Sequence, residues 1–182
     1  MIRTLYFTLL VCLGLTALSA PALATETANA TNTCPRTVSI GGALTEIIYR
    51  LGLEDCLVGV DTTSTYPDAA KTLPMVGYQR QLSAEGILSL RPNLILHTGQ
   101  AGPLAALKQI DQAGIRRIVV DDTPSLEGVY TKIQTVAEAF GAEKAGRTLI
   151  TAMREQAERL DISADAPHAR PAVLFIMRHG GG

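Results

Sequence analysis

The sequence contains no tryptophan, three phenylalanines and five tyrosines among its 182 residues. It also lacks the G-x-S-x-G and H-E-x-x-H motifs, a phosphate-binding loop and any pair of His or Cys residues at zinc spacing. Its 16 basic and 17 acidic residues nearly balance, and they form no basic cluster of the kind that binds nucleic acid. These absences argue against the well-marked enzyme and nucleic-acid-binding classes. The 47% of apolar residues still suffices for a globular core.

Only two of the three cysteines remain after the expected removal of an amino-terminal signal peptide, residues 1–24. This segment carries Arg3, a long apolar run and then the small-residue ending Ala22-Leu23-Ala24, which is the order of a cleaved export signal. A membrane anchor is the alternative, but the apolar run is short and Pro21 and small residues follow it. We therefore expect cleavage after Ala24 and export of the mature chain.

The two remaining cysteines, Cys34 and Cys56, each precede a predicted strand. If the two strands are parallel neighbours, both cysteines lie at the same amino-terminal edge of the sheet. A disulfide can form there in an exported protein. Two separate buried thiols are the alternative.

Strands and helices alternate along residues 35–124, after a polar lead-in at residues 25–34 that we expect to be disordered. The apolar runs and turn residues predict strands at 37–40, 57–60, 94–96 and 115–120, and helices at 43–51, 83–90 and from Pro103 to Gly114. This alternation predicts an α/β lobe with a parallel sheet and helices on both faces.

The pattern changes at Ser125. Residues 125–160 carry two apolar stripes at helical spacing, one on each side of Gly141, and contain no predicted strand. We interpret residues 125–165 as a helical connector. A strongly apolar strand is predicted at 170–177, so residues 166–182 are interpreted as the start of a second α/β lobe that this sequence does not complete.

The longest polar segment follows the strand at 57–60 and extends to Ser83. It leaves the carboxyl end of a predicted parallel strand, which is where ligands bind in open α/β sheets. Within it, Pro67 favours an extended conformation for Tyr66, and we expect the tyrosine ring to be exposed. Loops of this length inside a compact domain are often binding loops. Gly41-Gly42 lacks the partners of a nucleotide fingerprint and is interpreted as a tight turn.

Three histidines are scattered along the chain. His97 and His179 each follow a predicted strand and could face a cleft at the carboxyl edge, whereas His168 lies in a linker. An enzyme would need a nucleophile or an acid–base pair in that cleft. Only His97, Asp121 and Asp122 would support that interpretation.

Several motifs together resemble a known family. The run VGVDTTSTYPDAAKTLPMVGYQRQLSAEGILSLRPNLILHTGQAGP and the opening SIGGALTEIIYRLG resemble the periplasmic haemin-binding proteins of bacterial ABC importers. These proteins belong to a wider group that captures cobalamin and ferric siderophores. The resemblance extends from about Pro35 to the end of the chain, and the combination of S-T-Y-P with V-G-Y-x-R is typical of the haem-binding members.

The resemblance implies two α/β lobes joined by one long helix, with ferric haem held between them. Tyr66 matches the loop tyrosine that ligates the iron, and a phenolate is a hard anionic donor suited to Fe(III). Arg80 would then pair with a propionate, and Tyr78 would stack on the porphyrin. A surface arginine and a packing tyrosine are the alternatives. His97 would face the cleft, and His179 could be a second axial ligand from the other lobe.

The resemblance also implies that Glu85 docks onto the ABC permease, although a glutamate in the first turn of a helix is stabilised by the helix dipole without any partner. The sequence thus predicts a monomeric periplasmic protein that captures haem for a permease and ATPase complex at the inner membrane and catalyses no reaction. Binding of cobalamin or a ferric siderophore is the alternative within the family, and it would leave Tyr66 without an iron bond. Two alternatives remain. The protein could be a periplasmic α/β enzyme, or the chain could bind nothing because half of its pocket is absent.

Overall fold

The computed structural model describes residues 34–160, 172 and 174–176. These residues contain a four-stranded sheet with the order β2-β1-β5-β6, and every pairing in it is parallel. The α/β fold class predicted from the sequence is therefore confirmed. The strands are β1 (Thr37–Ile40), β2 (Leu57–Val60), β5 (Leu94–Thr98) and β6 (Arg116–Val120).

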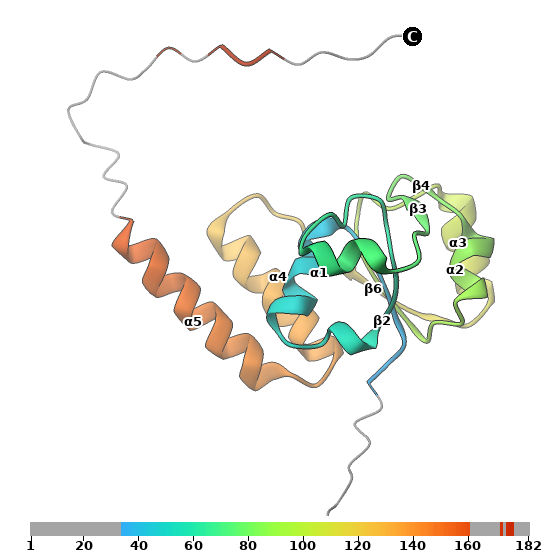
Figure 1. Cartoon of the computed structure of the whole chain (residues 1–182), viewed down its shortest axis with the longest axis horizontal. Coiled ribbons are helices and arrows are strands. Elements are labelled where there is room, and N and C mark those ends of the chain that lie inside the picture. The colour runs from blue at the N-terminus through green and yellow to red at the C-terminus, as the bar shows by residue number, and fades with distance from the viewer. Residues whose placement is uncertain (1–33, 161–171, 173, 177–182) are drawn as a thin grey trace, which may run out of the picture. The chain divides into compact units, whose positions relative to one another are not determined.

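Helices cover both faces of this sheet (Figure 1). The α-helices are α1 (Gly42–Arg50), α2 (Ala84–Ser89), α3 (Leu104–Gln112), α4 (Leu126–Ala139) and α5 (Glu143–Arg159). Val38, Ile40 and Ile95 pack towards α2 and α3, whereas Leu94 and Leu96 pack towards α1 and α4. Because helices cover both faces, every residue of the central strands β1 and β5 is buried, including the polar Thr37, Ser39 and Thr98.

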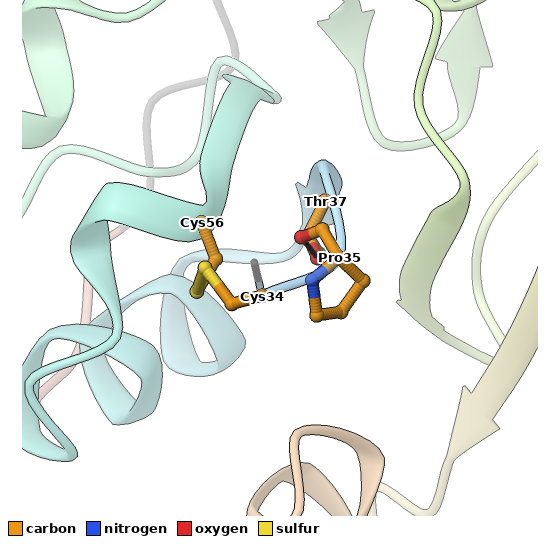
Figure 2. The surroundings of a disulfide bond; sticks show 4 residues. All are labelled: Cys34, Pro35, Thr37 and Cys56. Atoms are coloured by element: carbon orange, nitrogen blue, oxygen red, sulfur yellow. Dashed lines mark hydrogen bonds between the residues drawn. A yellow bond between two sulfur atoms is a disulfide. The ribbon is translucent and has the colours of Figure 1, made fainter. Parts of the chain in front are cut away.

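A covalent link closes the amino-terminal edge of the sheet. Cys34 precedes β1, and Cys56 ends the short 3-10 helix η1 (Glu54–Cys56) directly before β2. A disulfide joins these two residues, with their Cα atoms 5.5 Å apart (Figure 2). This is the pair that the sequence predicts. Beside it, the Arg36 guanidinium donates to the Leu90 carbonyl over 2.8 Å, which fastens the start of β1 to the end of α2.

The helical stretch after Ser125 is not one long helix but two, α4 and α5, separated near Gly141, which has a φ of 68°. The α5 helix runs back along α4, because Arg154 near its end contacts Glu127 near the start of α4 at 3.2 Å. Ile133 of α4 is buried in the core against α1. The α4 helix is therefore part of the lobe, and Leu149, Ile150 and Met153 of α5 pack against the same core.

The strand predicted at residues 170–177 is not formed in the part of this segment that is described. Ala172 and residues 174–176 are exposed and belong to no strand. A strand needs a neighbour to satisfy its backbone hydrogen bonds, and no described strand pairs with these residues. The expected signal peptide, His168 and His179 lie outside the described residues. Within those residues, no helix is long and apolar enough to cross a membrane.

Candidate functional site

The segment between β2 and α2 lies at the carboxyl edge of the sheet and is more ordered than a polar loop suggests. It contains the 3-10 helix η2 (Asp68–Thr72) and a hairpin of β3 (Gly77–Tyr78) and β4 (Gln81–Leu82). Between them the chain returns along β2. The Val60 amide donates to the Pro74 carbonyl over 3.0 Å, and the Val76 amide donates to the Val60 carbonyl over 2.9 Å.

Tyr66 projects from the first part of this segment. Its side chain is 58% exposed, as the sequence predicts, and its peptide bond to Pro67 is cis. The loop that carries it is fixed on both sides. Before Tyr66, the Thr62 amide donates to the Gly77 carbonyl over 3.0 Å, and after it the Ala70 amide donates to the Pro67 carbonyl over 2.9 Å. An exposed phenol therefore stands on a fixed backbone.

The hairpin brings Tyr78 and Arg80 to the same edge of the sheet. Tyr78 is partly exposed, and Arg80 lies in the turn between β3 and β4. The hairpin is fastened to the loop after β5, because the Gly102 amide donates to the Gln79 carbonyl and the Leu82 amide to the Gly102 carbonyl, both over 2.9 Å. The Thr62 to Gly77 hydrogen bond links the hairpin to the Tyr66 loop. Tyr66, Tyr78 and Arg80 thus belong to one connected surface.

A chain of polar contacts that the sequence did not reveal crosses this surface. The Arg80 guanidinium donates to Gln100 Oε1, and the Gln100 amide lies 3.5 Å from Asp122 Oδ2. Asp122 in turn forms an ion pair with Lys132 of α4. The Asp122 carboxylate therefore contacts a lysine and an amide. No nucleophile or base among the described residues hydrogen-bonds to it. Nothing in the sequence singles out Gln100, because its partner is 20 residues away along the chain.

A second missed residue, Asp61, lies beneath the Tyr66 loop and is completely buried. Its Oδ1 atom accepts hydrogen bonds from the Gly41 amide and the Ser64 hydroxyl, both at 2.9 Å. Its Oδ2 atom accepts from the Thr63 amide at 3.1 Å and from the Thr63 hydroxyl at 2.7 Å. The sequence gives a partial signal, since an aspartate followed by Thr and Ser favours such local turns.

His97 lies near the carboxyl end of β5, as the sequence predicts, but its ring is buried and does not reach an exposed cleft. His97 belongs to β5 and is 2% exposed, on the same sheet face as Ile95. Arg117 donates to its Nε2 over 2.8 Å, and its Nδ1 lies 2.6 Å from the Thr98 carbonyl. Arg117 is itself held by both carboxylate oxygens of Asp111. Burial lowers the pKa of His97 below its ordinary value, so the ring is neutral and serves the core.

Glu85 lies exposed in the first turn of α2. The Ser83 hydroxyl caps this helix by accepting from the Gly86 amide at 3.0 Å. One first-turn amide is thus satisfied without Glu85, whose side chain is exposed to solvent. Among the described residues, no three His, Cys, Asp or Glu side chains group together as a metal site would require.

Solved structures of periplasmic proteins share this architecture. A periplasmic heme-binding protein from Pseudomonas aeruginosa is 41% identical with a TM-score of 0.67, and the match covers 69% of this chain and 45% of that protein. The periplasmic heme-binding protein BhuT, solved in complex with two hemes, is 45% identical with a TM-score of 0.68, over 73% of this chain and 52% of its own.

Curated relatives include a vitamin B12-binding protein from Vibrio campbellii. It is 30% identical over 140 residues, which make up 77% of this chain and 50% of the relative. The chain thus spans about half the length of the proteins that it matches. A family model described as periplasmic binding protein matches residues 38–182, and the chain belongs to this family.

Proposed function

We propose that this protein captures haem in the periplasm and delivers it, as a monomer, to an ABC permease and ATPase complex at the inner membrane, without catalysing a reaction. The observation that carries the proposal is the exposed phenol of Tyr66 on a fixed loop at the carboxyl edge of the sheet. A phenolate oxygen in that position is a suitable ligand for ferric iron. Heme-binding proteins at 41% and 45% identity support haem, whereas vitamin B12-binding relatives at 30% and 35% identity keep cobalamin as the second candidate.

The neighbouring residues then take complementary roles. Arg80, tethered to Gln100 in the turn of the hairpin, is placed to exchange that contact for a haem propionate, which a guanidinium binds with two parallel hydrogen bonds. Tyr78 offers a partly exposed ring for contact with the porphyrin. Glu85, on the surface of α2, is the docking residue for the permease. Residues 35–142 form the first lobe in this proposal, α5 begins the connector, and residues 166–182 begin the second lobe.

A visible absorption titration with haemin tests this function, on protein expressed at the full length of its gene. The wild type is expected to develop the charge-transfer band of tyrosinate-bound ferric haem. In Tyr66→Phe the band is expected to disappear, and the affinity for haemin is expected to fall by about 100-fold or more. Mutating a residue that only hydrogen-bonds a metal ligand already lowers affinity by up to about 100-fold, and loss of the ligand itself should cost at least as much.

Tyr78→Phe is the matched control, because it removes the other exposed phenol of this edge and keeps the ring. It is expected to retain the band. If the band persists in Tyr66→Phe and disappears in Tyr78→Phe, the ligand assignment is wrong.

Cobalamin or a ferric siderophore is the second candidate ligand, and the vitamin B12-binding relative favours it. In that case haemin produces no charge-transfer band, and Tyr66→Phe leaves binding nearly unchanged. A parallel titration with cyanocobalamin separates the two ligands. The same titration on the present chain alone tests whether one lobe suffices for binding.

A further inference from the structure

Among the residues that the structure describes, no cationic side chain contacts the buried carboxylate of Asp61. An isolated buried charge is costly unless hydrogen bonds satisfy it. Asp61 receives four hydrogen bonds, two from backbone amides and two from hydroxyls, at distances between 2.7 and 3.1 Å. A residue at the end of a strand does not need four hydrogen-bond donors around its side chain. The position of these donors in the fold indicates what Asp61 does.

The donors join the start of α1 to the base of the Tyr66 loop. The N-cap residue of α1 is Gly41, which has no side chain to accept from the free amides of the first turn. Asp61 accepts from the Gly41 amide instead, and the Thr63 hydroxyl accepts from the Gly42 amide over 3.0 Å. The loop therefore caps the helix, and the negative charge lies at the positive end of the helix dipole.

The backbones of the two segments also touch. A Cβ atom added to Gly42 would lie 2.6 Å from the Thr63 carbonyl oxygen, closer than real contacts allow. Ser64, which is 1% exposed, donates to Asp61 and has its hydroxyl 2.8 Å from that of Thr45 in α1. Tyr66 is two residues beyond Ser64. The last buried point of the loop before the exposed phenol is therefore fixed by Asp61.

We propose that Asp61 is the positioning residue for Tyr66: its ionised carboxylate locks residues 62–65 onto the start of α1 and thereby fixes where the phenol stands. The role as ligand positioner rests on the proposed function, whereas the locking of the loop does not. Asp61→Asn is the most direct test. An amide cannot accept on both atoms, so its NH₂ group must face either the Gly41 or the Thr63 amide and break that hydrogen bond.

The matched control is Asp121→Asn. Asp121 also ends a strand and also faces the amide of the threonine two residues later, at 3.4 Å, but it is exposed and lies outside the Tyr66 loop. Gly42→Ala provides a second test that leaves the carboxylate intact, because the added methyl group displaces the Thr63 carbonyl. Asp61→Asn and Gly42→Ala are both expected to loosen the Tyr66 loop, whereas the control Asp121→Asn is expected to leave it unchanged.

Two measurements distinguish the outcomes. In the ligand-free protein, hydrogen exchange of the amides of residues 62–66 is expected to accelerate about tenfold or more in Asp61→Asn and Gly42→Ala, while strands β1 and β5 keep their protection. With haemin, the dissociation rate is expected to rise by about tenfold with a weaker tyrosinate band. Asp121→Asn is expected to match the wild type in both.

Unchanged exchange at residues 62–66 in folded Asp61→Asn would overturn the proposal. Equal acceleration of every amide would also overturn it, because Asp61 would then support the whole lobe and not the loop. If the wild type forms no tyrosinate band while the loop amides still respond to Asp61→Asn, the proposed function fails and the locking of the loop stands.

Discussion

The two edges of the same parallel sheet are built in different ways. At the amino-terminal edge the Cys34–Cys56 disulfide and the Arg36 contacts close short connections. At the carboxyl edge a long segment presents exposed Tyr66 and Tyr78. One edge therefore holds the lobe together, and the other leaves aromatic side chains exposed, where the proposed function places the ligand. This difference implies that the two properties can be changed separately.

The largest effect is expected from removing the disulfide, which should change the stability of the lobe without changing ligand binding. Replacing Cys34 and Cys56 together by Ser is expected to lower the free energy of unfolding by about 3 kcal/mol, because the bridge closes a loop of 22 residues in the unfolded chain. Urea denaturation measures this loss, and reduction of the wild type should reproduce it. Haemin affinity at low temperature, where both forms are folded, is expected to stay the same. A parallel loss of affinity would show that the edges are coupled.

The reverse experiment changes the carboxyl edge alone. Arg80→Gln is expected to weaken haemin binding about tenfold, since a hydrogen-bonded pair with a charged group contributes about 1.5 kcal/mol or more. The free energy of unfolding should not change, because the Arg80 side chain is exposed. Arg50→Gln, an exposed arginine paired with Glu46 at the end of α1, is the control and should alter neither quantity. An Arg80→Gln protein with full affinity would remove this residue from the site.

The smallest effect concerns His97, which lies near the carboxyl edge but serves the core. Burial lowers its pKa in the folded state, so the unfolded chain binds a proton more readily. The stability that depends on the neutral ring is therefore complete above the ordinary imidazole pKa and is lost as the pH falls towards the lowered value. The slope for one such group is at most about 1.4 kcal/mol per pH unit.

Denaturation of the ligand-free protein between neutral and mildly acidic pH measures this slope, and His97→Gln is expected to flatten it. A variant with the same pH profile as the wild type would assign the acid sensitivity to other groups.

Much of the fold follows from the sequence. The boundaries of β1 and β2 match the prediction, since their apolar runs end at the turn residues Gly41 and Asp61. The strand β5 is longer than predicted because pairing with β1 and β6 on both sides extends it over His97 and Thr98. The reversal between α4 and α5 is marked by Gly141, but its direction depends on contacts between the two helices that no local pattern encodes.

The site was only partly predictable, for a similar reason. The position of Tyr66 follows from a long loop at the end of a strand, together with the family motif. The contact of Arg80 with Gln100 joins two side chains 20 residues apart, and the capping of α1 joins the Asp61 side chain to the Gly41 amide, also 20 residues away. Such contacts depend on how neighbouring connections meet at the sheet edge, and composition and periodicity carry no information about them.

The return of the chain along β2 has a consequence for solubility. β2 is the outermost strand on its side of the sheet, and an outer strand with free amides and carbonyls can pair with another molecule and start aggregation. Both hydrogen-bonding groups of Val60 are instead occupied by Pro74 and Val76. The segment that carries Tyr66 and Tyr78 therefore also covers the carboxyl end of this outer strand, and a shortened loop would expose that end to intermolecular pairing.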